Sequence, residues 1–109
     1  MRIIASGVFP MPAKNILIID DDVELAELLK SFMESEGFAV QHAPEPVIGL
    51  SKALSGTIDL IILDIMLPGQ SGLEVLKQIR AESLLPILML TAKGDDTDRI
   101  LGLELGAAD

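Results

Sequence analysis

Four short apolar runs are spaced along the chain, over residues 14–19, 38–42, 58–63 and 86–90. The first, third and fourth runs hardly alternate polar with apolar residues, which is typical of strands buried on both faces of a sheet. Between the runs, apolar residues recur every three or four positions, the period of an amphipathic helix. The pattern therefore predicts four strands, each followed by a helix.

The expected helices are residues 23–35, a segment opened by Pro44 and Pro46, a segment from 71 or 72 to 80, and residues 96–105. Asp21 or Asp22 is expected to cap the first helix. Proline suits the start of the second, since first-turn N–H groups lack intrahelical partners. The apolar residues at helical spacing are Leu25, Leu28, Leu29 and Phe32 in the first helix, and those sharing a face of the second are Val47, Leu50, Ala53 and Leu54.

Strands that alternate with helices predict an α/β fold with a parallel sheet, right-handed crossovers and helices on both faces. Residues 1–13 show no sustained period and are interpreted as a leader or tag-like arm, which leaves residues 14–109 as one domain. A chain of 109 residues is long enough for one core and too short for two.

Composition narrows the class of function. The net charge of −9 and the absence of Trp and Tyr argue against direct contact with nucleic acid by these residues. No apolar run approaches the ~20 residues that a membrane span requires. The absence of cysteine excludes disulfides, thiolate metal sites and cysteine nucleophiles.

Polar side chains follow three of the four predicted strands. Asp20 and Asp21 come after the first, Asp64 ends the third and Thr91 ends the fourth. Because the carboxyl ends of parallel strands meet at one edge, the carboxylates are expected to lie together, where close like charges resist joint ionisation. A hard divalent ion with oxygen ligands, of which Mg²⁺ fits best, resolves this conflict.

A cation, helix N-termini that attract anions and an accessible carboxylate together suit phosphoryl transfer onto Asp64. Each feature alone has a simpler interpretation. Asp20 and Asp21 could merely cap a helix, Thr91 could be an ordinary strand-end hydroxyl, and Asp22 is expected to be the cap rather than a ligand. His42 is interpreted as an ordinary surface-strand histidine.

Four segments resemble the receiver domain of bacterial two-component response regulators. Three are residues 15–22, 59–72 and 86–92, and the fourth, residues 98–109, resembles the OmpR/PhoB-type branch. The motifs occur in order across residues 14–109, so the chain is identified as a member of this family. The resemblance implies a cytoplasmic protein with a flavodoxin-like (CheY-like) α/β/α fold whose sheet order is 2-1-3-4-5.

The resemblance also implies roles for individual residues. Asp64 would accept a phosphoryl group from the phosphohistidine of a sensor histidine kinase. Thr91 would be the switch hydroxyl. The ligands of Mg²⁺ would be Asp20, Asp21, Asp64 and the backbone carbonyl of Met66.

The sequence departs from the family at its end. The family continues into a fifth strand with an invariant lysine and into a fifth helix, and this branch adds a winged-helix DNA-binding domain, so the chain is interpreted as a truncated receiver. Lys93 is not expected to replace that lysine. The fourth strand would be an exposed apolar edge, and we expect either a swapped oligomer or a covering strand from residues 1–9.

Three matters stay open at this stage. Arg99, Glu104 and Asp109 match positions that form salt bridges across a homodimer face in this branch, but they could equally line a solvated helix. A HAD-type phosphatase, with its nucleophile in the Asp20–Asp22 segment, is the alternative enzyme. A pseudo-receiver, which binds partners without being phosphorylated, is the alternative interaction module.

Overall fold

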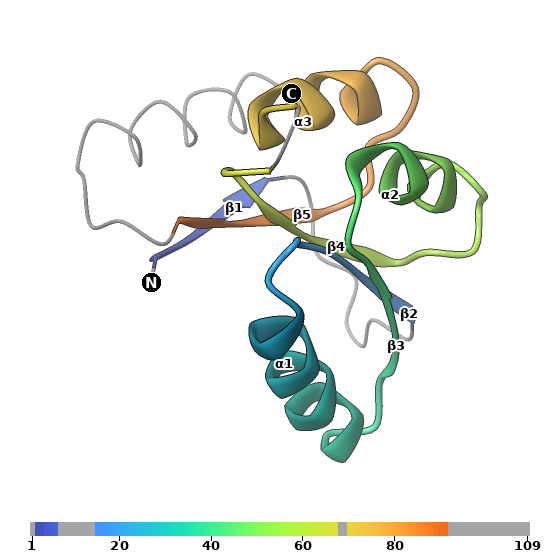
Figure 1. Cartoon of the computed structure of the whole chain (residues 1–109). Helices are drawn as coiled ribbons and strands as arrows, with labels where there is room; N and C mark the ends of the chain where they lie inside the picture. Colours follow the sequence, from blue (N-terminus) through green and yellow to red (C-terminus); the bar gives the residue numbers. More distant parts are fainter. Residues whose placement is uncertain (1, 7–14, 68–69, 92–109) are drawn as a thin grey trace.

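A computed structural model describes residues 2–6, 15–67 and 70–91 (Figure 1). Its elements in chain order are β1 (Arg2–Ser6), β2 (Asn15–Ile19), α1 (Val23–Ser35), β3 (Ala39–Ala43), α2 (Pro46–Ala53), β4 (Leu60–Asp64), α3 (Gly72–Arg80) and β5 (Ile87–Thr91). The predicted elements between residues 14 and 91 are all present, with bounds shifted by at most two residues for the strands. The helix expected over residues 96–105 lies outside the described part of the chain.

The strands form one sheet in the order β1-β5-β4-β2-β3. The pairs β2–β3, β2–β4 and β4–β5 are parallel. Counted from β2, this is the order 2-1-3-4 that the family resemblance predicts, so the flavodoxin-like fold is confirmed. Beyond that order, the sheet carries an antiparallel fifth strand at one edge, which makes it mixed rather than wholly parallel.

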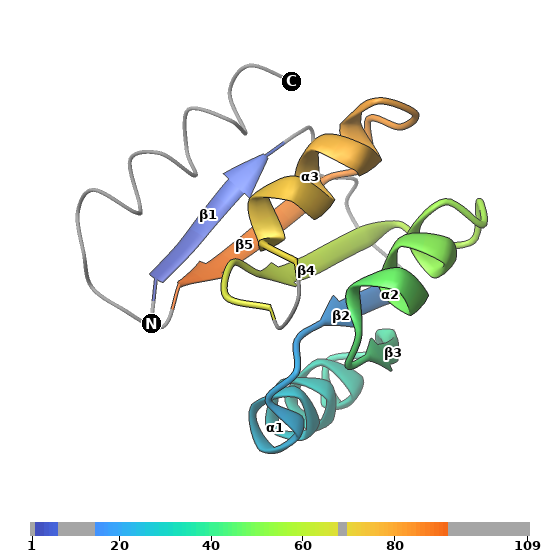
Figure 2. The ribbon, with the colours of Figure 1, turned by 45° about the horizontal axis from the view of Figure 1, so that its top comes forward.

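That fifth strand is β1, which runs alongside β5 (Figure 2). Its register places Arg2 opposite Thr91 and Ser6 opposite Ile87, so the pairing extends over the whole of β5. Of the two outcomes expected for the apolar edge, the structure therefore has the covering strand from the first nine residues. An open apolar edge invites pairing with another chain, and β1 removes that opportunity within the molecule.

Deletion of residues 1–6 is expected to expose β5 and to produce self-association. The physical reason is that the backbone N–H and C=O groups along the edge of β5 lose their partners on β1. Light scattering coupled to gel filtration is expected to show larger species for the deletion variant than for the full chain. A monodisperse, folded monomer of the deletion variant would contradict this protective role of β1.

Helices cover the two faces of the sheet unequally, with α1 on one face and α2 and α3 on the other (Figure 1). Successive residues of a strand point to opposite faces, so each buried strand contributes side chains to two hydrophobic clusters, one on each face of the sheet. On the α1 face, Ile16, Ile18 and Ile62 pack with Ala26. On the other face, Leu17, Ile19 and Leu63 belong to a larger cluster that also contains residues of α3.

The apolar face predicted for α2 is partly wrong. Val47 is 75% exposed, whereas the buried residues of the helix are Pro46, Gly49 and Ala53. The reason is close packing: a Cβ on Gly49 would meet side-chain atoms of Ile19 at 2.8 Å. The helix therefore approaches the sheet through its small residues, and the larger Val47 is turned away. In the part of the chain that the structure describes, no helix is long and apolar enough to cross a membrane.

On α1, the residues at helical spacing also divide between core and solvent. Ala26 is buried and Leu25 and Leu29 are half-buried, but Leu28 and Phe32 are 68% and 62% exposed. Of the four apolar residues predicted to line one face of α1, two therefore pack toward the sheet and two face solvent.

Candidate metal centre

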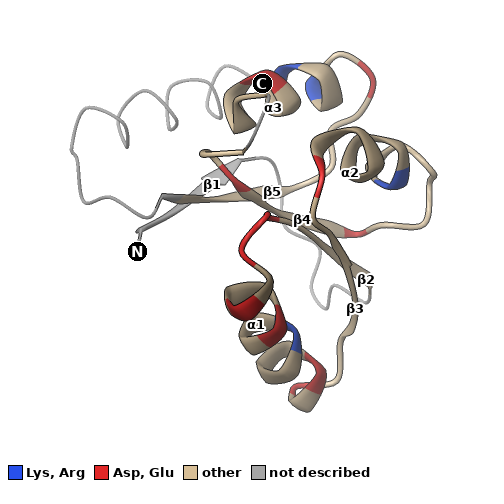
Figure 3. Ribbon diagram, in the orientation of Figure 1, with Lys and Arg blue, Asp and Glu red and all other residues tan. Residues whose placement is uncertain are grey.

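Three carboxylates meet at the carboxyl edge of the sheet. Asp20 and Asp21 follow β2, and Asp64 is the last residue of β4, its parallel neighbour. One oxygen from each of the three lies within 4.8 Å of the others. Figure 3 shows the acidic residues of this group where β2 leads into α1 and where β4 ends. The register of β2 and β4, with Ile19 opposite Leu63, is what brings the aspartates together.

Asp20 is the buried member of the group, at 2% exposure. Its backbone N–H donates to the carbonyl oxygen of Ala43 at 3.2 Å, and its Oδ1 accepts from the N–H of Asp22 at 2.9 Å. Asp22 in turn caps α1, since its Oδ1 accepts from the N–H of Leu25 at 3.0 Å. The prediction that Asp22 caps the helix is confirmed. The carboxylates that group with Asp64 are those of Asp20 and Asp21.

Asp64 is half-buried, and the chain turns sharply after it. Its Oδ1 accepts from the N–H of Met66 at 3.2 Å. The first residue of α3, Gly72, donates its N–H to the carbonyl oxygen of Ile65 at 2.7 Å. A Cβ on Gly72 would overlap the carbonyl oxygen of Asp64 and would lie 2.6 Å from Cα of Ile65. The backbone that carries Asp64 is therefore packed directly against the start of α3.

The carboxyl groups disturb one another's ionisation. The pKa of Asp64 is raised from its ordinary 3.8 to about 6, mainly by burial; the Met66 N–H lowers it, and the charges of Asp20 and Asp21 raise it. Burial also raises the pKa of Asp20, against the lowering effect of the Asp22 N–H. Such a set of mutually opposed carboxylates is stabilised by a cation, and its oxygen donors are those that Mg²⁺ prefers. The residues present thus fit a hard divalent ion.

The other predicted site residues are placed only in part. Thr91 ends β5, one residue beyond Leu90, which is the register partner of Asp64. Its backbone therefore lies at the same edge as the carboxylates. Met66 follows two residues after Asp64, with its side chain 59% exposed. Lys93 and the predicted dimer-face residues Arg99, Glu104 and Asp109 lie outside the described residues.

His42 was missed by the sequence reasoning. It is half-buried near the end of β3, and its Nε2 lies 2.7 Å from the backbone carbonyl oxygen of Asp20. The interpretation as an ordinary surface-strand histidine is therefore wrong. The partner of His42 is a backbone atom 22 residues away, which no spacing of side chains in the sequence indicates. The register of β2 on β3, which pairs Ile18 with His42, is the signal that could have indicated the contact.

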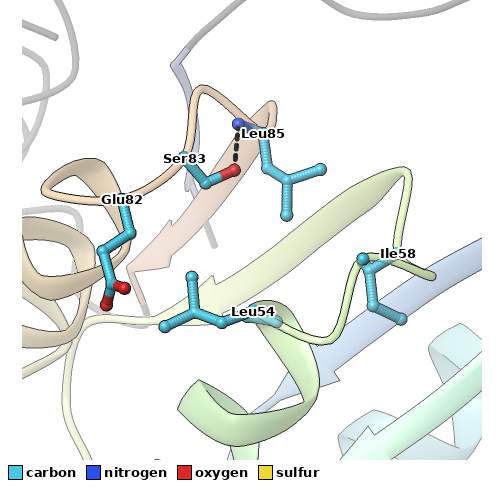
Figure 4. Close-up of a pocket in the computed structure, with 7 residues that line it drawn as sticks. Leu54, Ile58, Glu82, Ser83 and Leu85 are labelled. Carbon is cyan, nitrogen blue, oxygen red and sulfur yellow. Dashed lines mark hydrogen bonds between the residues drawn. The ribbon is translucent and has the colours of Figure 1, made fainter.

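A cavity of about 320 Å³ lies at the other end of the parallel strands, where β4 and β5 begin (Figure 4). It is lined by Leu54 and Gly56 after α2, Ile58 before β4, and Glu82, Ser83 and Leu85 between α3 and β5, together with Ala53. Because these segments precede the parallel strands, the cavity is separate from the carboxylates, which follow them. It takes no part in the metal centre.

The family model of the response regulator receiver domain matches residues 16–109. The chain belongs to the receiver domains of response regulators. This assignment separates it from HAD-type phosphatases.

Curated relatives of this receiver domain include transcriptional regulatory proteins. The CpxR homolog of Haemophilus influenzae is 50% identical over 95 residues, which are 87% of this chain and 41% of that protein. The alkaline phosphatase synthesis regulatory protein PhoP of Bacillus subtilis is 47% identical over 97 residues, 88% of this chain and 40% of its own length. The receiver domain thus spans about 40% of the curated relatives that it matches.

Solved receiver domains have the same fold. The BeF₃-activated N-terminal receiver domain of RstA from Klebsiella pneumoniae is 31% identical, with a TM-score of 0.81 over 88% of this chain and 82% of that one. The non-phosphorylated HemR receiver domain of Leptospira biflexa is 34% identical, with a TM-score of 0.76 over 87% and 77% of the two chains.

Proposed function

We propose that Asp64 accepts a phosphoryl group from the phosphohistidine of a sensor histidine kinase, with Mg²⁺ bound beside it. The observation that carries this proposal is the approach of Asp20, Asp21 and Asp64 to within 4.8 Å at one sheet edge. The bond between phosphorus and the imidazole nitrogen breaks as a carboxylate oxygen of Asp64 bonds to phosphorus. A bound Mg²⁺ would supply positive charge that offsets the negative charge of the transferred group.

The three carboxylates are suited to different parts of this reaction. Asp20 is 2% exposed, so an incoming phosphohistidine cannot reach it, whereas Asp64 is half-buried and accessible from the edge. Asp20 and Asp21 would hold the ion together with Asp64 and the backbone carbonyl of Met66. The N–H of Met66 already donates to Oδ1 of Asp64 and fixes the direction of that carboxylate.

Thr91 is the switch hydroxyl in this proposal. The end of β5 brings its backbone beside the end of β4, so a change at Asp64 would be transmitted to β5 and to the segment that follows. The relatives named above are transcriptional regulators, and control of transcription is the proposed output of the whole protein, located in the cytoplasm. Arg99, Glu104 and Asp109 remain the predicted contacts of a homodimer.

Phosphorylation can be tested directly with acetyl phosphate and Mg²⁺. Mass spectrometry of the intact protein is expected to show one added phosphoryl group, stable in acid and labile in base, as an acyl phosphate is. The adduct will be absent from Asp64→Asn, which lacks the nucleophilic carboxylate, and will be retained by Asp22→Asn, a nearby carboxylate that only caps α1.

Other outcomes distinguish the alternatives. An adduct on Asp20, or multiple turnover of a phosphate ester, would contradict the assignment of Asp64 as the acceptor. A chain that binds Mg²⁺ but never gains a phosphoryl group, with acetyl phosphate or with a phosphorylated kinase, would be a pseudo-receiver.

A further inference from the structure

Two residues at the end of β3 form hydrogen bonds with the backbone N–H and the backbone carbonyl of Asp20. The N–H of Asp20 donates to the carbonyl oxygen of Ala43 at 3.2 Å, which continues the ladder between β2 and β3. The carbonyl oxygen of Asp20 lies 2.7 Å from Nε2 of His42. A carbonyl oxygen can only accept, so Nε2 carries the hydrogen in this contact. Asp20 is therefore bound to β3 through one strand hydrogen bond and one side-chain hydrogen bond.

The hydrogen bond from the His42 side chain lies where the backbone hydrogen bonds between β2 and β3 end. β3 ends at Ala43, and the next residue, Pro44, has no backbone N–H. A carbonyl group as enclosed as that of Asp20 requires a donor, because a buried acceptor without one costs about 1–3 kcal/mol. The imidazole of His42 reaches along β3 and supplies that donor.

We propose that His42 is a positioning residue for the metal centre: its Nε2–H fixes the backbone of Asp20 and so holds the Asp20 carboxylate in place for the cation. The proposal rests on the function proposed above, in which Asp20 is a ligand of Mg²⁺. Mg²⁺ demands near-ideal octahedral geometry, so a small rotation of one ligand weakens binding. Loss of a residue that orients a metal ligand typically lowers metal affinity about 10- to 100-fold.

Two variants of His42 separate the hydrogen bond from the ring. The amide nitrogen of glutamine takes the place of Nε2, whereas that of the shorter asparagine takes the place of Nδ1 and cannot reach Asp20. His42→Gln is therefore expected to bind Mg²⁺ within about threefold of the unaltered chain. His42→Asn is expected to bind it about tenfold more weakly. Both changes leave a polar side chain at a half-buried position, so both variants are expected to fold.

A control variant accounts for general loss of stability. Val40→Ala removes apolar atoms from the same strand, in the cluster on the α1 face, where the register partner of Val40 is Ile16 rather than a residue of the metal centre. It is expected to lower the melting temperature while leaving Mg²⁺ affinity unchanged. Calorimetric titration with MgCl₂, and thermal unfolding in EDTA, will be compared across the four chains.

The outcomes distinguish this proposal from the function on which it rests. Weak binding by His42→Asn, rescued in His42→Gln, supports positioning through Nε2. Equal Mg²⁺ affinity in all four chains, with only the melting temperatures changed, overturns the proposal and leaves the proposed function intact. Failure of the unaltered chain to bind Mg²⁺ would overturn both.

Discussion

Gly72→Ala is expected to destabilise the protein by about 3 kcal/mol, at the upper end of what overpacking usually costs. The added Cβ would overlap the carbonyl oxygen of Asp64 and lie 2.6 Å from Cα of Ile65, so backbone rather than side chains must move. Intrinsic helix propensity acts in the opposite direction, because alanine is favoured over glycine in a helix by up to about 1 kcal/mol. A destabilising result would therefore show that contact with Asp64 outweighs propensity at this position.

Urea unfolding of three variants tests this expectation. Glu74→Ala, at an exposed position of the same helix, serves as the matched control and is expected to change stability by less than about 0.5 kcal/mol. Gly49→Ala would meet only the side chain of Ile19, at 2.8 Å, and is expected to cost less than Gly72→Ala. If Gly72→Ala were as stable as the unaltered chain, the close packing of α3 on the end of β4 would be contradicted. The variant is also expected to lose Mg²⁺ affinity, since the backbone that it displaces carries Asp64.

The stability of the metal-free protein is expected to fall as the pH rises from about 4 to about 7. The pKa of Asp64 is raised from 3.8 to about 6, chiefly by burial, so between these values the folded state binds a proton that the unfolded state releases. The proton stabilises the fold below pH 4, and this contribution is lost as the pH passes 6. Mg²⁺ acts in the opposite sense, because it binds the ionised carboxylates and competes with the proton.

Thermal unfolding with EDTA and with MgCl₂, at pH 4.5 and pH 7.5, measures both effects. Saturating Mg²⁺ is expected to raise the melting temperature by about 5 °C or more at the higher pH and by little at the lower. Asp64→Asn provides the reference, because it keeps the shape of the side chain without its charge. Its metal-free stability is expected to vary less with pH, and its response to Mg²⁺ should be lost. Parallel pH profiles for Asp64→Asn and the unaltered chain would show that Asp64 does not carry the effect.

The sequence by itself determined the alternation of strands and helices and the place of the acidic residues. Apolar runs without alternation require burial on both faces, and helical spacing between them requires crossovers that cover the sheet. Parallel strands end at one edge, so Asp20, Asp21 and Asp64 had to approach one another once β2 and β4 were neighbours. These features follow from local periodicity and from the order of strands and helices, and both can be read directly from the sequence.

Only the tertiary structure decided the contacts made by particular backbone atoms. The pairing of β1 with β5, which joins segments more than 80 residues apart, was one of two outcomes expected for the apolar edge, and only the structure decided between them. The approach of Gly72 to Asp64 and of His42 to the carbonyl oxygen of Asp20 depends on the register and separation of packed elements. Val47 is exposed for the same reason. The helix α2 lies so close to the sheet that its small residues form the buried face, and the larger Val47 faces solvent. Sequence patterns specify which face an element buries only approximately, whereas close packing fixes which atoms touch.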